Sequence, residues 1–532
     1  IYDLGQIIKA NAVATAVFTL SNVFVYGSHM IPRFIFLNDF IICTSLIGGI
    51  RFLSRIIRER YHGPPSGKEG VKVLIVGAGA AGILLLKEYR NNPVLGEVVG
   101  FIDDDKTKYH ESIQGVRILG NRNAIPGVVQ AYGIGEIILA IPSAKGQVIR
   151  DLVACCKVPD VKLKIVPGMS EILSGKLKIG LREVRPEDLL GRETVSIDEG
   201  EIAKYLKDKK VLITGAAGSI GSELCRQAAN FSLSEMILID HNENNLYFLT
   251  IELKNKFKGL NIRSVVGDIN NIGLLKELFS EYKPQVVFHA AAYKHVPFME
   301  ENPMAAAENN ALGSRNMIYA AHHYKAERFV LISTDKAVNP INIMGLSKRL
   351  AEIFLQAKAK RSKTKFMAVR FGNVLGSDGS VVPLFKKQIE AGGPITITHP
   401  DTTRYFMSIK EAVLLVLQAG ALGVGGEIFI LDMGEQIKIV DLARDLVALS
   451  GLELGKDILV QYIGLRPGEK IREELLLDKD KDKITKHDKI YISQAHDFDL
   501  VVLRSQVRDL ERYLRSAEKE KVIRKMKEIA GK

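Results

Sequence analysis

Residues 1–60 differ from the rest of the chain in how their apolar positions are spaced. Residues 10–29 contain no Asp, Glu, Lys or Arg, and a run of about twenty such residues crosses a ~30 Å hydrocarbon layer. A second apolar run, residues 34–50, contains Asp39, whose insertion near a helix centre costs about 2.5–3.5 kcal/mol. Four arginines follow directly: Arg51, Arg55, Arg58 and Arg60. Since positively charged flanks stay in the cytoplasm, the pattern predicts transmembrane helices followed by cytoplasmic domains; a pair of ordinary buried helices is the alternative.

Beyond this region, apolar runs alternate regularly with stretches of helical spacing. After a Pro- and Gly-rich linker at residues 61–70, the runs "VKVLIV", "EVVGFI", "EIILAI" and "VKLKIV" read as buried strands, and the pattern restarts at "KKVLIT". Such alternation indicates parallel sheets covered on both faces. The predicted fold class is therefore α/β, with two doubly wound, Rossmann-like domains at residues 71–197 and 198–495. A helical tail at residues 496–532 is expected to be exposed and basic.

Composition narrows the choice of partners. Apolar residues make up 47% of the 532 residues and charged residues 25%, values that are ordinary for a folded protein. The net charge of +12 favours anionic partners such as nucleotide-sugars, anionic lipid or nucleic acid. Four cysteines without CxxC or CxxH spacing suggest neither a metal site nor a disulfide framework. The chain begins with Ile1 rather than Met, so we expect a fragment of a longer protein.

A glycine loop opens the second α/β domain. Gly215-Ala-Ala-Gly218-Ser-Ile-Gly221 lies between an apolar strand and a helix, where a pyrophosphate can rest on the helix N-terminus. Asp240 ends the next strand about twenty residues later, placed to accept hydrogen bonds from an adenosine ribose. No Arg or Lys follows it in "DHNENNLY", which favours NAD over NADP; a loop that merely tightens a turn is the alternative. The residues predicted to bind the cofactor are Gly215, Gly218, Ser219, Ile220, Gly221, Asp240, Asp268, Ile269, Ala290, Ala291, Ala292 and Lys348.

The first α/β domain carries a similar loop. Gly77-Ala-Gly79-Ala-Ala-Gly82 also follows a strand, and Asp103 comes about twenty residues later, as in a dinucleotide fold. No set of residues resembling catalytic machinery follows it. A bound nucleotide, a regulatory role and a purely structural role all remain open for this loop.

The strand "RFVLISTDK" delivers Thr334, Asp335 and Lys336 to the carboxyl edge of the second sheet, where ligands bind in such folds. An adjacent acid and amine supply a proton donor and a proton acceptor within reach of one substrate. Lys348, in a helix that begins near Met344, is placed to bond a nicotinamide ribose. A solvated loop pair is the alternative for Asp335 and Lys336.

Seven motifs together resemble a known family: "TGAAGSIGSEL", "HAAAYKHVP", "STDKAVNP", "MGLSK", "FGNVLGSDGSVVPLF", "DTTRYFM" and "RPGEK". The chain resembles the extended short-chain dehydrogenase/reductases that act on nucleotide-sugars. Within them it is similar to the membrane-attached UDP-N-acetylglucosamine 4,6-dehydratases of bacterial glycan synthesis. Short-chain dehydrogenases usually carry Tyr four places before the Lys, but long members of this family commonly carry Met, as Met344 does here.

The resemblance implies a reaction and roles for residues. Oxidation of the sugar at C4 by NAD makes the C5 proton removable; Lys336 would take that proton while Asp335 protonates the departing 6-hydroxyl, and hydride returns to C6. A lysine acts as a base when its pKa falls toward neutral, so we expect a lowered pKa for Lys336. Thr334 would position the C4 hydroxyl. Met344 cannot accept that hydroxyl's proton, so water or a relay through Thr334 is required.

Substrate contacts also follow from the resemblance. Lys294 and Asn373 would touch the sugar-nucleotide, and Glu469 would bind a nucleotide hydroxyl. Arg404 and Arg466 would meet the diphosphate, since the planar guanidinium can bond two oxygens at once. A surface salt bridge is the alternative for each arginine.

We therefore expect an NAD-dependent lyase that converts UDP-N-acetylglucosamine, with C5 configuration retained, to a UDP-4-keto-6-deoxy-N-acetylhexosamine. The expected enzyme is a homo-oligomer on the inner (cytoplasmic) membrane, in contact with the lipid bilayer and not with nucleic acid, with its catalytic domains in the cytoplasm. Three other functions remain open: a dehydratase that inverts C5, a nucleotide-sugar 4-epimerase, and a non-catalytic nucleotide-sensing membrane scaffold.

Overall fold

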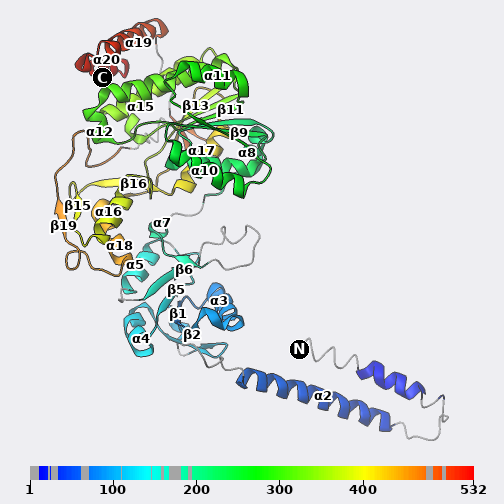
Figure 1. Ribbon diagram of the computed structural model, residues 1–532. Helices are drawn as coiled ribbons and strands as arrows, with labels where there is room; N and C mark the ends of the chain where they lie inside the picture. The colour runs from blue at the N-terminus through cyan, green and yellow to red at the C-terminus, as the bar shows by residue number, and fades with distance from the viewer. Residues whose placement is uncertain are drawn as a thin grey trace. The chain divides into compact units, whose positions relative to one another are not determined.

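The structure is a computed structural model, shown in Figure 1. It describes the following residues: 11–21, 24, 34–61, 71–109, 111–144, 146–156, 161–166, 181–189, 195–474, 483–493 and 499–532. The linker predicted at residues 61–70 lies almost entirely outside these ranges. The alternation of strands and helices follows the apolar runs of the sequence, and it forms two separate parallel sheets.

The N-terminal region is helical where it is described. Residues 11–21 form one helix, and helix α2 covers Phe34–Tyr61. The Asn11 amide donates to the Phe40 carbonyl at 3.2 Å and to the Thr44 hydroxyl at 2.7 Å. Among the described residues, no helix combines the length and the apolar character needed to cross a bilayer. The predicted transmembrane segment is therefore unsupported, and much of the run at residues 10–29 lies outside the described ranges.

The first sheet has the strand order β3-β4-β2-β1-β5-β6-β7. Its strands are β1 Lys72–Val76, β2 Glu97–Ile102, β3 Ser112–Ile113, β4 Val116–Gly120, β5 Glu136–Leu139, β6 Lys162–Ile165 and β7 Arg182–Glu183. The inner pairs β1–β5 and β5–β6 are parallel, whereas the edge strands β3 and β7 pair antiparallel. The accompanying helices are α3 Ala80–Asn91, α4 Ile125–Tyr132, α5 Gly146–Cys155 and α7 Pro186–Leu189.

The second sheet is larger and has the order β10-β9-β8-β11-β12-β13-β17-β21-β20. Its parallel strands are β8 Lys210–Thr214, β9 Glu235–Asp240, β10 Asn261–Val266, β11 Val286–His289, β12 Arg328–Ile332, β13 Lys365–Arg370 and β17 Ile428–Leu431, and its antiparallel edge is β20 Lys483–Ile484 and β21 Ile490–Ser493. The order reverses at β8, which pairs with β9 on one side and β11 on the other. This reversal is the switch point at which ligands bind in doubly wound sheets.

Helices cover both faces of the second sheet, as Figure 1 shows. One apolar core includes buried residues of α11 Ile272–Tyr282, α14 Ser314–His323 and α15 Ile343–Ala359. The other core includes residues of α8 Glu199–Leu206, α9 Ser219–Ala228, α10 Glu243–Lys256 and α17 Ile409–Leu422. Burial on both faces explains why the strands read as continuous apolar runs.

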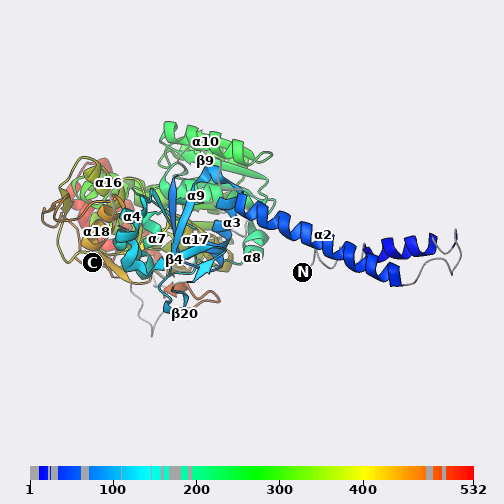
Figure 2. The same ribbon diagram turned by 90° about the horizontal axis from the view of Figure 1, so that it is seen from below.

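A smaller part stands at the carboxyl edge of this sheet. It contains β14 Asn373–Val374, β16 Thr403–Met407 and β18 Gln436–Lys438 in one small sheet, and β15 Ile395–Ile397 paired with β19 Val460–Tyr462 in another. Helices α16 Val381–Glu390 and α18 Ile439–Leu449 lie side by side in Figures 1 and 2. They share a separate apolar core with these strands. This part supplies the second wall of the site described below.

The C-terminal tail forms two helices, α19 Leu500–Arg515 and α20 Lys519–Ile529. Their apolar residues, including Leu510 and Met526, belong to the same buried core as α15. Arg315 of α14 forms an ion pair with Glu511 of α19. The sequence prediction of an exposed basic tail is therefore wrong for one face of each helix, because an amphipathic helix buries its apolar stripe while keeping its charged stripe in water.

Candidate active site

A cavity of about 670 Å³ lies at the carboxyl ends of the central strands. Its lining comes from the glycine loop after β8, the loops after β11 and β12, the start of α15, and the smaller part around β14 and β16. The predicted site residues that line it are Gly215, Gly218, Ser219, Ile220, Gly221, Ala290, Ala292, Lys294, Thr334, Lys336, Met344, Lys348, Asn373, Arg404, Arg466 and Glu469. The predicted residues that do not line it are Asp240, Asp268, Ile269, Ala291 and Asp335.

The glycine loop needs glycine at two positions. Gly215 has φ +61°, and a Cβ added there would lie 2.6 Å from the Ala291 nitrogen. A Cβ on Gly221 would lie 2.0 Å from the Gly215 carbonyl oxygen. The loop thus turns tightly and brings the start of α9 against β8. This cradle, tightened at its glycines, fits a pyrophosphate, which the N-terminus of α9 would face.

Asp240 anchors this loop from the end of β9. Its Oδ2 accepts a hydrogen bond from the Ala217 nitrogen at 2.9 Å, and its Oδ1 accepts one from the Asn242 nitrogen at 2.8 Å. The carboxylate therefore stands beside the glycine loop, as a ribose-binding acid would. Asp103 of the first α/β domain makes the matching bond to the Ala78 nitrogen at 2.8 Å, and it also accepts from Lys108 at 3.1 Å.

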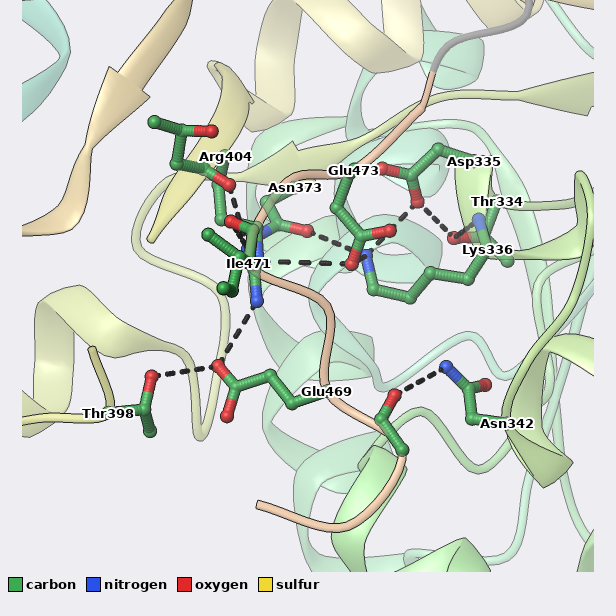
Figure 3. A network of polar contacts seen from close by, with 12 residues as sticks. Thr334, Asp335, Lys336, Asn342, Asn373, Thr398, Arg404, Glu469, Ile471 and Glu473 are labelled. Atoms are coloured by element: carbon green, nitrogen blue, oxygen red, sulfur yellow. Dashed lines mark hydrogen bonds and ion pairs between the residues drawn. The ribbon is translucent and has the colours of Figure 1, made fainter. Parts of the chain in front are cut away.

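The loop after β12 gathers an acid, an amine and a hydroxyl, as Figure 3 shows. The Thr334 hydroxyl donates to Asp335 Oδ1 at 2.8 Å. Lys336 Nζ donates to Asp335 Oδ1 and to Asn373 Oδ1, both at 3.1 Å. Lys336 Nζ also lies 3.4 Å from Glu473 Oε1. One ammonium group is therefore held between two carboxylates and an amide.

Asp335 lies behind this arrangement rather than in the cavity wall. Its exposed fraction is 2%, and its Oδ2 has no hydrogen-bond partner among the residues that the structure describes. Lys336 and Thr334 line the cavity in front of it. The sequence predicted the correct edge of the sheet for Asp335 and Lys336. Asp335 does not line the cavity, but it is hydrogen-bonded to Thr334 and Lys336, which do.

The charge state of Lys336 differs from the sequence expectation. Burial alone would lower its pKa, but the carboxylates of Asp335 and Glu473 outweigh burial and the repulsion from Arg404, and they raise the pKa above its ordinary value. The expected lowering of this pKa is therefore wrong for the arrangement in the structure. Lys336 is protonated there near neutral pH.

Lys348 stands one helical turn after Met344 on α15, and both line the cavity. Burial lowers the pKa of Lys348 to about 8, against the opposing effect of Glu352. Glu352 is fully buried, where it accepts hydrogen bonds from Arg370 at 2.7 and 2.6 Å and from Ser333 at 2.7 Å. This cluster ties β12, β13 and α15 together beneath the cavity, and it therefore fixes the turn that carries Lys348.

Replacing Glu352 with Gln should destabilise the protein by about 3–5 kcal/mol at neutral pH, because it breaks the buried ion pair between Glu352 and Arg370. Burial raises the pKa of Glu352, but Arg370 and Arg349 outweigh it and hold that pKa at about 2, below the ordinary 4.5. The stabilisation is thus fully present above about pH 4.5 and fades as the pH falls toward 2. Chemical unfolding at several pH values measures both effects. The exposed control Glu277→Gln should change stability by less than about 0.5 kcal/mol.

Arg404 organises the opposite wall of the cavity. Its guanidinium donates to the Thr403 carbonyl at 2.7 Å, to the Ile471 carbonyl at 3.1 Å and to Glu469 Oε1 at 3.1 Å. Glu469 also accepts from the Thr398 hydroxyl at 3.0 Å. Arg404 is almost fully buried, so the alternative of a surface salt bridge does not describe it. Arg404 lines the cavity, where a guanidinium can meet an anionic group.

Residues 466–473 form a strap across the cavity. The Asn342 amide, at the start of α15, donates to the Gly468 carbonyl at 3.0 Å. Further along the strap, the Thr403 nitrogen donates to the Ile471 carbonyl at 3.0 Å. The strap therefore connects the dinucleotide side of the cavity, at α15, with the wall that carries Arg404 (Figure 3).

Comparison with known proteins gives the family. A model described as "Polysaccharide biosynthesis protein" matches residues 211–495, and one described as "CoA-binding domain" matches residues 2–167. The "Probable polysaccharide biosynthesis protein EpsC" of Bacillus subtilis is 46% identical over 466 residues, which cover 87% of this chain and 77% of that protein. The chain belongs to the polysaccharide biosynthesis protein family. The sequence resemblance is confirmed at this level.

Two further proteins are similar to about half of this chain. A "UDP-glucose 4-epimerase" of Rickettsia bellii is 38% identical over 283 residues, covering 52% of this chain and 80% of that protein. The "X-ray structure of Pen from Bacillus thuringiensis" has 33% sequence identity and a TM-score of 0.50, covering 55% of this chain and 93% of that chain. The proteins similar to this chain thus include one that is named for a reaction of a nucleotide-sugar.

Several polar residues that hold the site together were not predicted from the sequence: Asn342, Glu352, Arg370, Thr398 and Glu473. Asn342 and its partner on the strap are 126 residues apart, and no periodic pattern connects such distant positions. Glu473 stands in "EKIREELL", which reads as an ordinary solvated charge run. Only the distances in the folded chain show that its carboxylate reaches Lys336.

Proposed function

We propose that this polysaccharide biosynthesis protein is an NAD-dependent UDP-N-acetylglucosamine 4,6-dehydratase that retains the configuration at C5. The observation that carries the proposal is the position of Thr334, Asp335 and Lys336 at the end of β12, beside a cavity that also contains the glycine loop and Arg404. A base, an acid and a hydroxyl are what the removal of a C5 proton and a 6-hydroxyl requires.

The cofactor would be held by residues of the dinucleotide side. Gly215, Gly218 and Gly221 would hold the pyrophosphate, Asp240 the adenosine ribose, and Lys348 the nicotinamide ribose. When bound, NAD accepts hydride from C4 of the sugar and returns it to C6. The cradle at the loop and the anchored carboxylate of Asp240 support this placement.

The proton steps use the loop after β12. Lys336, as the free amine, takes the C5 proton and later delivers a proton from its ammonium group back to C5. In deuterated water the exchanged ammonium group delivers deuterium. The Thr334 hydroxyl lines the cavity and donates to Asp335, so it can pass the C4-hydroxyl proton to the buried carboxylate. The same carboxyl then returns that proton, through Thr334, to the departing 6-hydroxyl. The relay performs the task that the thioether of Met344 cannot perform, because a thioether is only a weak acceptor.

On the opposite wall, Arg404 and Arg466 would bind the diphosphate, and Lys294, Asn373 and Glu469 would contact the sugar and nucleoside. Burial lowers the pKa of Lys294, against the opposing effect of Asp378. Arg404 is already held by two carbonyls and by Glu469, so its guanidinium can meet an anion with little loss of side-chain freedom.

A UDP-hexose 4-epimerase is the second candidate, favoured by the identity with the Rickettsia protein of that name. An epimerase changes only C4 and has no use for an acid and a base at C5 and C6. The Asp335–Lys336 pair therefore favours the dehydratase.

One experiment separates the candidates. The full chain is incubated with NAD and UDP-N-acetylglucosamine in deuterated water, and the sugar is followed by NMR. A 4-keto-6-deoxy product with deuterium at C5 and unchanged C5 configuration supports the proposal, and an inverted C5 identifies the inverting dehydratase. A C4 epimer without loss of water identifies an epimerase. Unchanged substrate supports a non-catalytic scaffold.

We also propose that the N-terminal helices attach the chain to the inner (cytoplasmic) membrane, with the catalytic domain in the cytoplasm as a homo-oligomer. The support is the row of exposed apolar side chains on α2, including Ile42 and Leu46. Replacing both with Lys should move the full chain from the membrane fraction to the soluble fraction after cell lysis. Val424→Lys, at an exposed apolar position elsewhere, should leave the chain in the membrane fraction. Equal partition of all variants would contradict the attachment.

A further inference from the structure

Glu473 is a buried acid that the proton steps above do not use. Its exposed fraction is 5%. Its Oε1 lies 3.4 Å from Lys336 Nζ and 3.8 Å from Arg404 Nε. Burying a carboxylate costs free energy unless the carboxylate is paired. Glu473 is paired with Lys336, the proposed base, on one side and with Arg404, proposed to bind the diphosphate, on the other (Figure 3).

The proposed reaction requires Lys336 to lose a proton before it can act. Lys336 takes the C5 proton only as a free amine, yet Asp335 and Glu473 hold it protonated. Asp335 must itself remain a carboxylate in order to accept the C4-hydroxyl proton from Thr334. The proton that leaves Lys336 therefore needs another acceptor.

The surroundings of Lys336 Nζ offer few choices among the described residues. Its hydrogen-bond and ion-pair partners are Asp335, Asn373 and Glu473, and Arg404 is the other charged group that acts on it. An amide and a guanidinium cannot accept a proton near neutral pH. With Asp335 already in use, Glu473 is the group that remains.

We propose that Glu473 accepts the proton of Lys336 when a UDP-sugar fills the cavity, which makes Lys336 the base for C5; this inference rests on the function proposed above. One N–H bond of Lys336 breaks and one O–H bond of Glu473 forms, so the pair keeps the same number of protons and the same net charge. After Lys336 delivers a proton to C5 of the product it is again a free amine, and Glu473 then gives its proton back to Lys336, so the ion pair is restored with no net proton from solvent.

The strap explains why substrate binding would drive this transfer. Arg404 lies between Glu469 and Glu473, so a diphosphate bound to Arg404 draws positive charge away from Glu473 and adds negative charge near it. Both changes raise the proton affinity of the Glu473 carboxylate. Exclusion of water from the filled cavity also favours the uncharged forms of the acid and the amine. Binding of the nucleotide end is thereby coupled to activation of the base at the sugar end.

The test is the pH dependence of kcat for the full chain with NAD and UDP-N-acetylglucosamine, from about pH 6 to 9. In the wild type, kcat should be independent of pH. The active form, neutral Lys336 with protonated Glu473, contains the same number of protons as the ion pair of charged Lys336 with the Glu473 carboxylate. In Glu473→Gln the lysine proton must leave to water, so kcat should rise about tenfold per pH unit below the pKa of Lys336. Glu469→Gln is the matched control: Glu469 contacts Arg404 but not Lys336, so this variant should raise KM and keep kcat flat.

Two results would overturn the inference while leaving the dehydratase intact. One is a wild-type kcat that itself rises tenfold per pH unit, and the other is a Glu473→Gln profile parallel to that of the wild type. A wild type that forms no product at any pH would instead refute the proposed function. UDP affinity of Glu473→Gln that is no weaker than that of the wild type, measured by calorimetry, would show that the site remains folded, because loss of the carboxylate beside Arg404 should by linkage keep or tighten diphosphate binding. Glu473→Asp, which keeps a carboxylate, should lower kcat but keep it flat, and a tenfold rise per pH unit in that variant would also refute the inference.

Discussion

Replacing Lys336 with Met should lower kcat for the dehydration of UDP-N-acetylglucosamine by about 10²–10⁴-fold, the range that a positioned general base contributes. Met keeps most of the side-chain volume and removes the amine that lines the cavity. The affinities for NAD and UDP should change little, because the glycine loop and Arg404 are untouched. Turnover by NMR and binding by calorimetry measure the two halves of this prediction.

Asp335→Asn should give a similar loss of kcat, since the amide can neither store nor return the proton that Thr334 relays. The exposed Lys387 lies outside the cavity, so Lys387→Met serves as the control and should keep wild-type turnover. If Lys336→Met lost NAD binding as severely as turnover, the loop after β12 would be structural and the proposed chemistry would be wrong.

Replacing Gly221 with Ala should weaken NAD binding by about tenfold to a hundredfold. The added Cβ would lie 2.0 Å from the Gly215 carbonyl oxygen, and overpacking of this kind costs about 1–3 kcal/mol, where 1.4 kcal/mol corresponds to tenfold in affinity. Helix α9 must then move away from β8, which opens the cradle for the pyrophosphate. Calorimetric titration of the full chain with NAD measures the loss.

Gly82→Ala is a matched control in the first α/β domain, because its Cβ would lie 2.1 Å from the Gly77 carbonyl oxygen. The same kind of clash then occurs in the other glycine loop. We expect NAD affinity to be unchanged in this variant, since the cavity with the proposed catalytic residues belongs to the second sheet. Loss of NAD binding in Gly82→Ala alone would place the cofactor in the first domain instead.

The fold was largely predictable because its signals are local. Continuous apolar runs become the buried parallel strands of both sheets, and the glycine loop at Gly215 forms the turn that its spacing predicts. The N-terminal run and the C-terminal tail were harder to predict. An apolar run alone does not distinguish a membrane helix from other uses of an apolar surface. A basic helix can still bury its apolar stripe, as α19 does through Leu510.

Much of the cavity lining was predictable from the sequence, but the electrostatics of the site were not. Parallel strands deliver their carboxyl ends to one edge, so Thr334 and Lys336 could be placed beside the glycine loop from sequence alone. The direction of a side chain depends on its neighbours, and Asp335 turns behind the cavity wall. The pKa of Lys336 could not be predicted, because one of the carboxylates that raise it is on Glu473, far along the chain.

The strap at residues 466–473 restricts how this protein can be recombined with its relatives. It belongs in sequence to the part proposed to contact the sugar-nucleotide, yet it is bonded to Asn342 on α15 and leads directly to Glu473 beside Lys336. A chimera that takes the region around Arg404 from a relative therefore also takes that relative's residue at position 473, which lies beside Lys336 of the recipient chain. Exchange of substrate preference between family members should succeed only when the strap and the loop after β12 are transplanted together.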